Sequence, residues 1–131
     1  MSAVAKKLGI KSGATIAVAG HPLSEVRELL GEIPEGATVS ERTGAVADQM
    51  LLVADGLADL APMLDNVWSE IAPGGRLWVW YRKGATRSRL QGSDAPLHRD
   101  TLQALLAEHG MDGVTLISVD DTWSSMRVRE L

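Results

Sequence analysis

Short, nearly continuous apolar runs alternate with amphipathic helical patterns along this chain, and this alternation limits the possible folds more than any other feature. Three of the runs are ATIAVA (residues 14–19), QMLLVA (residues 49–54) and RLWVWY (residues 76–81). Strands that are buried on both faces have this character, whereas strands with one wet face alternate apolar and polar residues. The pattern therefore predicts a mostly parallel sheet that is covered by helices on both faces.

The remaining elements complete a predicted sheet of about six strands. Further strands are expected at residues 37–40, 114–119 and 125–128. Helices are expected within residues 21–34 and at residues 57–71 and 98–109, where leucines recur at helical spacing. Only a few residues separate the last two strands, so these should pair as an antiparallel hairpin. We expect one three-layer, Rossmann-like α/β domain over residues 1–131.

Composition narrows the class of function. The chain carries a formal net charge of −4 and contains no cysteine, which excludes disulfides, thiolate metal sites and a cysteine nucleophile. An acidic chain has no general attraction to nucleic acid or anionic lipid. Neither a secretion signal nor a membrane-spanning apolar stretch is evident. We therefore expect a soluble, cytoplasmic protein that binds neither nucleic acid nor membranes.

Residues 71–77, IAPGGRL, stand between a predicted helix and a predicted strand. The proline ends the helix, and the glycines allow a tight turn into the strand. In this setting the stretch resembles the L-x-P-G-G-x-L sequence that precedes the fifth strand of class I S-adenosylmethionine-dependent methyltransferases. The resemblance implies the fold of that class and is silent about activity.

Two phrases at opposite ends of the chain carry a second resemblance. KLGIKSG (residues 7–13) and DDTWS (residues 120–124) are similar to phrases in a family of short, uncharacterised bacterial proteins that is known as a domain of unknown function. The similarity covers most of the chain, although residues 84–98 depart from the family pattern. It implies a reduced methyltransferase-like fold and supplies no mechanism.

The methyltransferase resemblance implies three features that hold the cofactor: an acid and a glycine-rich turn after the first strand, an acid after the second, and a third strand and helix that wall the adenine. Here Gly20, His21 and Pro22 follow the first strand, and a proline donates no backbone hydrogen bond. Only residues 41–48 precede the next strand, whereas a parallel crossover needs about a dozen residues. We therefore predict that one strand–helix unit is missing and that no cofactor is bound.

Ligands of open α/β sheets bind at the carboxyl ends of the strands. If a cofactor does bind, we expect S-adenosylmethionine. The candidate cofactor-binding residues at this edge are Gly20, His21, Glu41 and Asp55. Glu41 stands where the resemblance implies an acid for the ribose hydroxyls. The simpler interpretation is that His21 starts a helix and that Glu41 is a solvated strand-end residue.

A long polar loop is predicted at residues 82–97, and its first part is basic. Four residues there form a candidate anion-binding cluster: Arg82, Lys83, Arg87 and Arg89. Arginine presents a bidentate fork that matches phosphate or carboxylate oxygens. The alternative is a solvated loop without a partner. No catalytic residue and no metal site is predicted.

The tryptophans are expected to belong mainly to the core. Trp78 and Trp80 should share one face of the sheet, while Tyr81 takes the other. Trp123 lies between the last two strands, where its large ring must either fold back on the body or meet a partner.

Three functions remain open. The preferred one is a non-catalytic module that binds a small anionic ligand or a protein partner at the carboxyl edge of the sheet. The second is a minimal S-adenosylmethionine-dependent methyltransferase that uses Gly20, Glu41 and Asp55. The third is a structural subunit, in which exposed edge strands and Trp123 form a homodimer or a contact with another protein.

Overall fold

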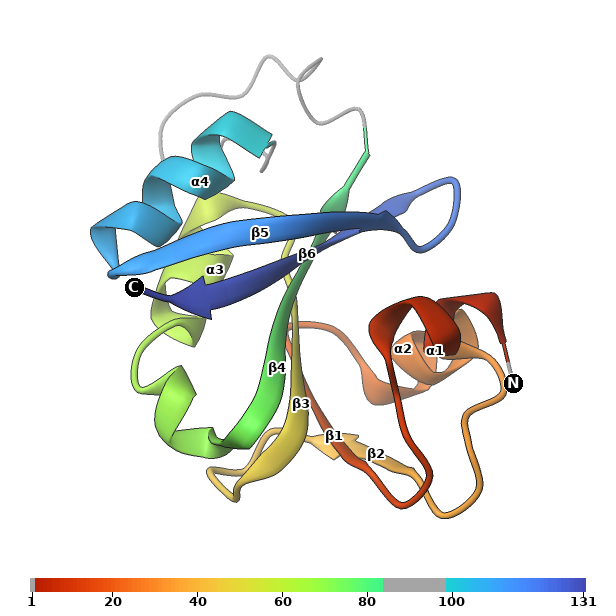
Figure 1. The fold of residues 1–131 in the computed structure, drawn as a ribbon. Helices are drawn as coiled ribbons and strands as arrows, with labels where there is room; N and C mark the ends of the chain where they lie inside the picture. Colours follow the sequence, from red (N-terminus) through yellow and green to blue (C-terminus); the bar gives the residue numbers. More distant parts are fainter. Residues whose placement is uncertain (1, 84–98) are drawn as a thin grey trace.

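The computed structural model describes residues 2–83 and 99–131 (Figure 1). Its six-stranded sheet has the order β2-β1-β3-β4-β6-β5. The strands are β1 (Thr15–Ala19), β2 (Thr38–Glu41), β3 (Ala47–Val53), β4 (Ile71–Arg82), β5 (Met111–Ser118) and β6 (Trp123–Glu130). β1 to β4 run parallel, and β6 is antiparallel to β4 and β5. The predicted mostly parallel sheet with a C-terminal antiparallel hairpin is confirmed.

Helices cover both faces of this sheet. They are α1 (Ala3–Leu8), α2 (Leu23–Leu30), α3 (Leu57–Met63), the 3-10 helix η1 (Val67–Glu70) and α4 (Arg99–Glu108). Figure 1 shows α1 and α2 on one side of the sheet and α3 and α4 on the other. The result is the three-layer arrangement that the alternating pattern predicts.

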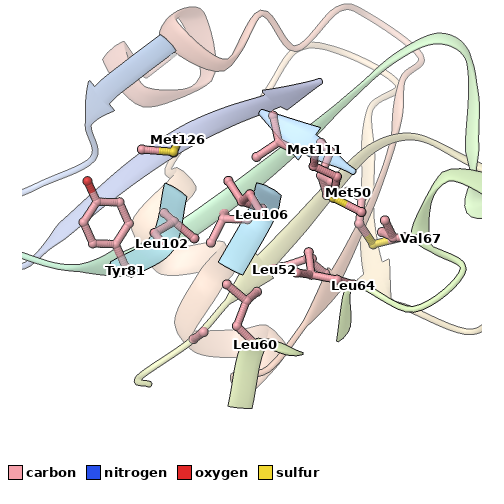
Figure 2. Close-up of a cluster of buried hydrophobic side chains, with 14 of the residues drawn as sticks. Met50, Leu52, Leu60, Leu64, Val67, Tyr81, Leu102, Leu106, Met111 and Met126 are labelled. Atoms are coloured by element: carbon pink, nitrogen blue, oxygen red, sulfur yellow. The ribbon is translucent and has the colours of Figure 1, made fainter. Parts of the chain in front are cut away.

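Each face of the sheet has its own apolar core. Side chains of β3, β4, β6, α3 and α4 meet on one face, where Leu52, Leu60 and Leu106 are fully buried (Figure 2). Trp78 and Trp80 lie in the opposite core, between the sheet and the pair α1 and α2. Tyr81 belongs to the first core. The predicted division of these aromatic side chains between the two faces is therefore confirmed.

The short helix α1 was not predicted from the sequence. Ser2 caps its N-terminus by accepting a hydrogen bond of 3.0 Å from a first-turn amide, and Gly9 ends it with a φ of 73°. Buried polar contacts tie the last turn to the sheet. Gln49 donates to the Leu8 carbonyl over 3.1 Å and accepts from the Trp78 indole over 2.9 Å. A six-residue helix is too short to show a clear period, so these contacts define it.

The helix predicted at residues 57–71 is shorter than expected and stops at Met63. Asn66 adopts a φ of 57°, in the left-handed region that interrupts a right-handed helix. A turn and η1 take up the remaining length, and β4 begins at Ile71 rather than at residue 76. The apolar spacing that predicted one long helix is therefore divided between α3 and η1.

β2 and β3 are joined by residues 42–46, which form neither a strand nor a helix. β2 is consequently the outermost strand at its end of the sheet. The third strand that the methyltransferase resemblance implies would continue the sheet beyond β2. The predicted lack of one strand–helix unit is thus visible in the topology.

Arg42 anchors this short link to α3 and η1. Its guanidinium forms a two-pronged ion pair with Glu70, with Nε–Oε1 and Nη2–Oε2 distances of 2.9 and 2.7 Å. It also donates to the carbonyl oxygens of Met63 (2.7 Å) and Asp65 (3.3 Å). The Arg42 and Glu70 side chains are only 16% and 13% exposed. Hydrogen bonding from Arg42 holds the pKa of Glu70 below its usual value.

We expect Glu70→Gln to lower the free energy of unfolding by about 1–3 kcal/mol, because it leaves a largely buried guanidinium without its counter-charge. Asp112→Asn is the matched control. The Asp112–Arg129 pair is 39% and 63% exposed, and such pairs contribute at most about 1 kcal/mol. Urea unfolding of both variants measures the difference. Equal losses would contradict a special role for the Arg42–Glu70 pair.

Candidate functional site

Polar side chains connect the carboxyl ends of β1, β3 and β4. His21 follows β1, Asp55 follows β3 and Arg82 ends β4. The His21 Nε2 atom lies 3.0 Å from Asp55 Oδ2, and Arg82 Nε donates to Asp55 Oδ1 over 2.8 Å. These residues gather at one edge of the sheet, as the strand assignments predicted. Their proposed roles in ligand binding remain predictions.

Trp123 and Glu25 complete this group, and neither was predicted to belong to it. The Arg82 guanidinium carbon lies 4.6 Å from the centroid of the Trp123 ring, and the His21 ring meets the same indole edge-on at 5.1 Å. Trp123 is 3% exposed, so it folds back on the body, one of the two alternatives. Glu25 Oε1 lies 3.4 Å from His21 Nδ1. We call His21, Glu25, Asp55, Arg82 and Trp123 the edge cluster.

Charges are paired within the edge cluster. Burial opposes the ionisation of Asp55, but hydrogen bonds from Arg82 and His21 outweigh it and hold the pKa of Asp55 below its usual value. Both ring nitrogens of His21 face carboxylates, and its side chain is 11% exposed. In this structure His21 is therefore held between two carboxylates.

Gly20 lies where the backbones of β1 and β3 come close together. Its φ is +101°, and a Cβ atom there would lie 1.9 Å from the Val53 carbonyl oxygen. Backbone packing therefore accounts for this glycine. Two open hollows of about 460 and 400 Å³ adjoin it. His21 and Glu41 line the first hollow, and Asp55 lines the second.

The predicted anion-binding cluster is only partly within the described residues. Arg82 is engaged by Asp55 and Trp123. Lys83 lies beside it and donates from Nζ to the Ser118 hydroxyl over 2.5 Å. Arg87 and Arg89 lie outside the described residues. An anion bound here would therefore compete with Asp55 for Arg82 and with the Ser118 hydroxyl for Lys83.

Within residues 2–83 and 99–131, no group of histidine, aspartate and glutamate side chains is arranged to hold a metal ion. In the same part of the chain, no helix has the length and apolar character needed to cross a membrane.

Solved structures with this fold include several S-adenosylmethionine-dependent methyltransferases. Fibrillarin from Aeropyrum pernix, in complex with S-adenosyl-L-methionine, aligns with a TM-score of 0.61 at 10% identity, over 97% of this chain and 73% of its own. A S-adenosylmethionine-dependent methyltransferase from Aquifex aeolicus aligns with a TM-score of 0.60 at 11% identity, over 94% of this chain and 85% of its own. The N-methyltransferase NodS from Bradyrhizobium japonicum, in complex with S-adenosyl-L-homocysteine, aligns with a TM-score of 0.58 at 16% identity. The alignment covers 97% of this chain and 82% of NodS.

No family model matches the chain, and no curated protein sequence matches it. At these identities the structural matches establish the fold alone, which is that of the class I methyltransferases. The narrower resemblance to a bacterial domain of unknown function stays a prediction.

Gly20→Ala is expected to destabilise the domain by about 3 kcal/mol or more, because the new Cβ would collide with the Val53 carbonyl as well as strain the backbone. Gly44→Ala is the matched control. Gly44 has a similar φ of +97° and no atom within 4 Å of a Cβ position, so it should lose only about 1–2 kcal/mol through strain. Denaturant unfolding compares the two variants. A loss for Gly20→Ala no larger than that for Gly44→Ala would argue against a packing role.

The lowered pKa of Asp55 predicts a loss of stability in acid. The folded state holds this carboxyl ionised more strongly than the unfolded chain does. The stabilisation is therefore fully present above the unfolded pKa of about 4 and declines as the pH falls through the folded pKa. The difference in unfolding free energy between the wild type and Asp55→Asn should be largest at neutral pH and shrink in acid, as measured by urea titration. A difference that stays constant would contradict this assignment.

Proposed function

We propose that this domain binds a small anionic ligand at the carboxyl edge of its sheet and does not transfer methyl groups. The observation that carries the proposal is the 3.0 Å contact between His21 and Asp55, which bridges the ends of β1 and β3. In open α/β sheets the ligand crevice lies at this edge. A cofactor entering between these strands would have to displace a contact that Arg82 also supports.

The loop after β1 and the link after β2 support the same proposal. Pro22 has no backbone donor, and Gly20 is packed against the Val53 carbonyl. Residues 42–46 supply neither strand nor helix at the place of the adenine wall. The proline in the first loop and the short link after β2 thus support a site without the usual donors and adenine wall.

Arg82 is the residue through which we expect the ligand to be held. Asp55 engages its Nε atom, but the side chain is 48% exposed. Its terminal nitrogens can therefore still donate to an anionic group that approaches from solvent. Trp123 packs against the guanidinium and restricts its orientation. Lys83 is exposed next to it and adds positive charge.

One observation favours a second candidate, a minimal methyltransferase. Glu41 ends β2, is exposed, and lines the same hollow as Gly20. The methyltransferase resemblance implies an acid at this position for the ribose hydroxyls. A substitution of Glu41 therefore distinguishes the two candidate functions.

Thermal unfolding with millimolar S-adenosylhomocysteine tests the proposal. We expect no rise in melting temperature, because a ligand that binds the native state alone must stabilise it. Fibrillarin from Aeropyrum pernix, which has been solved with bound S-adenosyl-L-methionine, is the positive control. A saturable rise that Glu41→Gln removes would overturn the proposal and support the methyltransferase candidate.

The anion-binding half of the proposal uses the same assay with a series of small carboxylates. At least one should raise the melting temperature of the wild type, and Arg82→Gln should abolish that rise. Lys6→Gln is the matched control, since Lys6 is an exposed residue of α1 and this change removes the same charge. Equal rises in both variants would show that the carboxylates act on general charge and not at Arg82.

A further inference from the structure

Two stretches that the sequence analysis singled out meet at the opposite, amino edge of the sheet. Residues 9–13 come from the KLGIKSG phrase and residues 73–76 from the PGGR turn. Apart from the buried Ile10, these residues line an open hollow of about 330 Å³ together with the start of β3. The pairing of β3 with β4 shifts register at this place, so the PGG residues bulge out of β4. The function proposed above uses neither stretch.

Arg76 is the central side chain of this hollow. It is half-buried, and its Nη1 atom donates to the Leu8 carbonyl over 3.2 Å. A Cβ atom on Gly9 would lie 2.4 Å from the same nitrogen, so the absence of a side chain at Gly9 makes room for the guanidinium. Within residues 2–83 and 99–131, no carboxylate forms an ion pair with Arg76. A partly desolvated guanidinium without a counter-charge is costly, and here it is also held in place.

Other donors converge on the same hollow. Lys11 and Ser12 line it and are exposed. Asp48 is the acid of the lining, and its Oδ2 atom already accepts hydrogen bonds from the Thr15 amide (2.9 Å) and hydroxyl (3.2 Å). Two cations, Lys11 and Arg76, therefore stand against one carboxylate that is partly satisfied. The hollow carries a net positive charge in a chain that is acidic as a whole.

We propose that this hollow binds the phosphate group of a small molecule. A guanidinium fork, an ammonium and a hydroxyl together supply more donors than the two oxygens of a carboxylate need, and they match the oxygens and the double charge of a phosphate monoester. Gly13 and Gly74 line the hollow, and no atom lies within 4 Å of a Cβ position at either residue. Arg76 forms the base of the site, and Lys11 and Ser12 form its rim.

The site is independent of the ligand proposed at the carboxyl edge, because the two share no residue. Either assignment can therefore fail without the other. An effect of phosphate that depends on Lys11 belongs to the hollow at the amino edge, and an effect of carboxylates that depends on Arg82 belongs to the edge cluster.

Titration of the ¹⁵N-labelled full chain with inorganic phosphate, at constant pH and ionic strength, tests the proposal. Saturable amide shifts are expected at Gly13, Gly74 and Gly75, whose glycine resonances are well separated in a proton–nitrogen correlation spectrum. Acetate at matched ionic strength should produce much smaller shifts. Equal shifts with acetate and phosphate, or shifts that grow without saturating, would overturn the proposal.

Two lysine variants test whether phosphate binds in this hollow. Lys11→Gln should weaken phosphate binding about three- to tenfold, as expected for the loss of one charge-assisted hydrogen bond at an exposed position. Lys6→Gln removes the same charge from a residue outside the hollow and should leave the affinity unchanged. Both positions are exposed, so both variants should fold. Equal weakening by the two variants would show that phosphate responds to general surface charge, and the proposal would be wrong.

Discussion

The two-pronged ion pair between Arg42 and Glu70 is the interaction on which the shortened fold depends. A parallel crossover usually takes about a dozen residues or more, and here residues 42–46 make the return from β2 to β3. A link this short cannot bring a helix to cover the sheet, so side-chain contacts supplement the backbone hydrogen bond from the Arg42 amide to the Val18 carbonyl (2.8 Å). Arg42 provides these side-chain contacts, because it joins the link to Glu70 and to the carbonyl groups of Met63 and Asp65 at the end of α3. The sheet can therefore end at β2 while the apolar cores on its two faces remain buried.

The two edges of the sheet differ in how their charges are satisfied. At the carboxyl edge, Asp55 hydrogen-bonds with His21 and Arg82, and the Trp123 ring contacts both of these residues. At the amino edge, Arg76 is half-buried and donates a hydrogen bond to the Leu8 backbone carbonyl. Paired charges stabilise the folded chain by themselves, whereas an unpaired, partly desolvated cation gains most from an external anion. An anion in the amino-edge hollow would therefore pair with an unmatched cation, whereas an anion at the carboxyl edge would bind the part of Arg82 that Asp55 leaves exposed.

The place of the candidate site could be predicted, but its composition could not. Once ATIAVA and QMLLVA were assigned to parallel strands, His21 and Asp55 had to lie at the same edge, because each follows its strand directly. Trp123 reaches that edge from the antiparallel hairpin, and nothing in the local sequence specifies whether its ring turns inward. Glu25 was within reach of prediction through its four-residue spacing from His21. The hollow around Arg76 needed coordinates, since it joins segments far apart in the chain.

By itself the sequence determined the fold class, the positions of most strands and the absence of a strand–helix unit, because hydrophobic period and chain length are local properties. It did not determine α1, which depends on the buried contacts of Gln49 with Leu8 and Trp78, nor the end of α3 at Met63. Tertiary structure alone decided which charges are paired. Ion pairs such as Arg42–Glu70 and Arg82–Asp55 join residues that are distant in sequence, and their partners are fixed only when the strands and helices have packed.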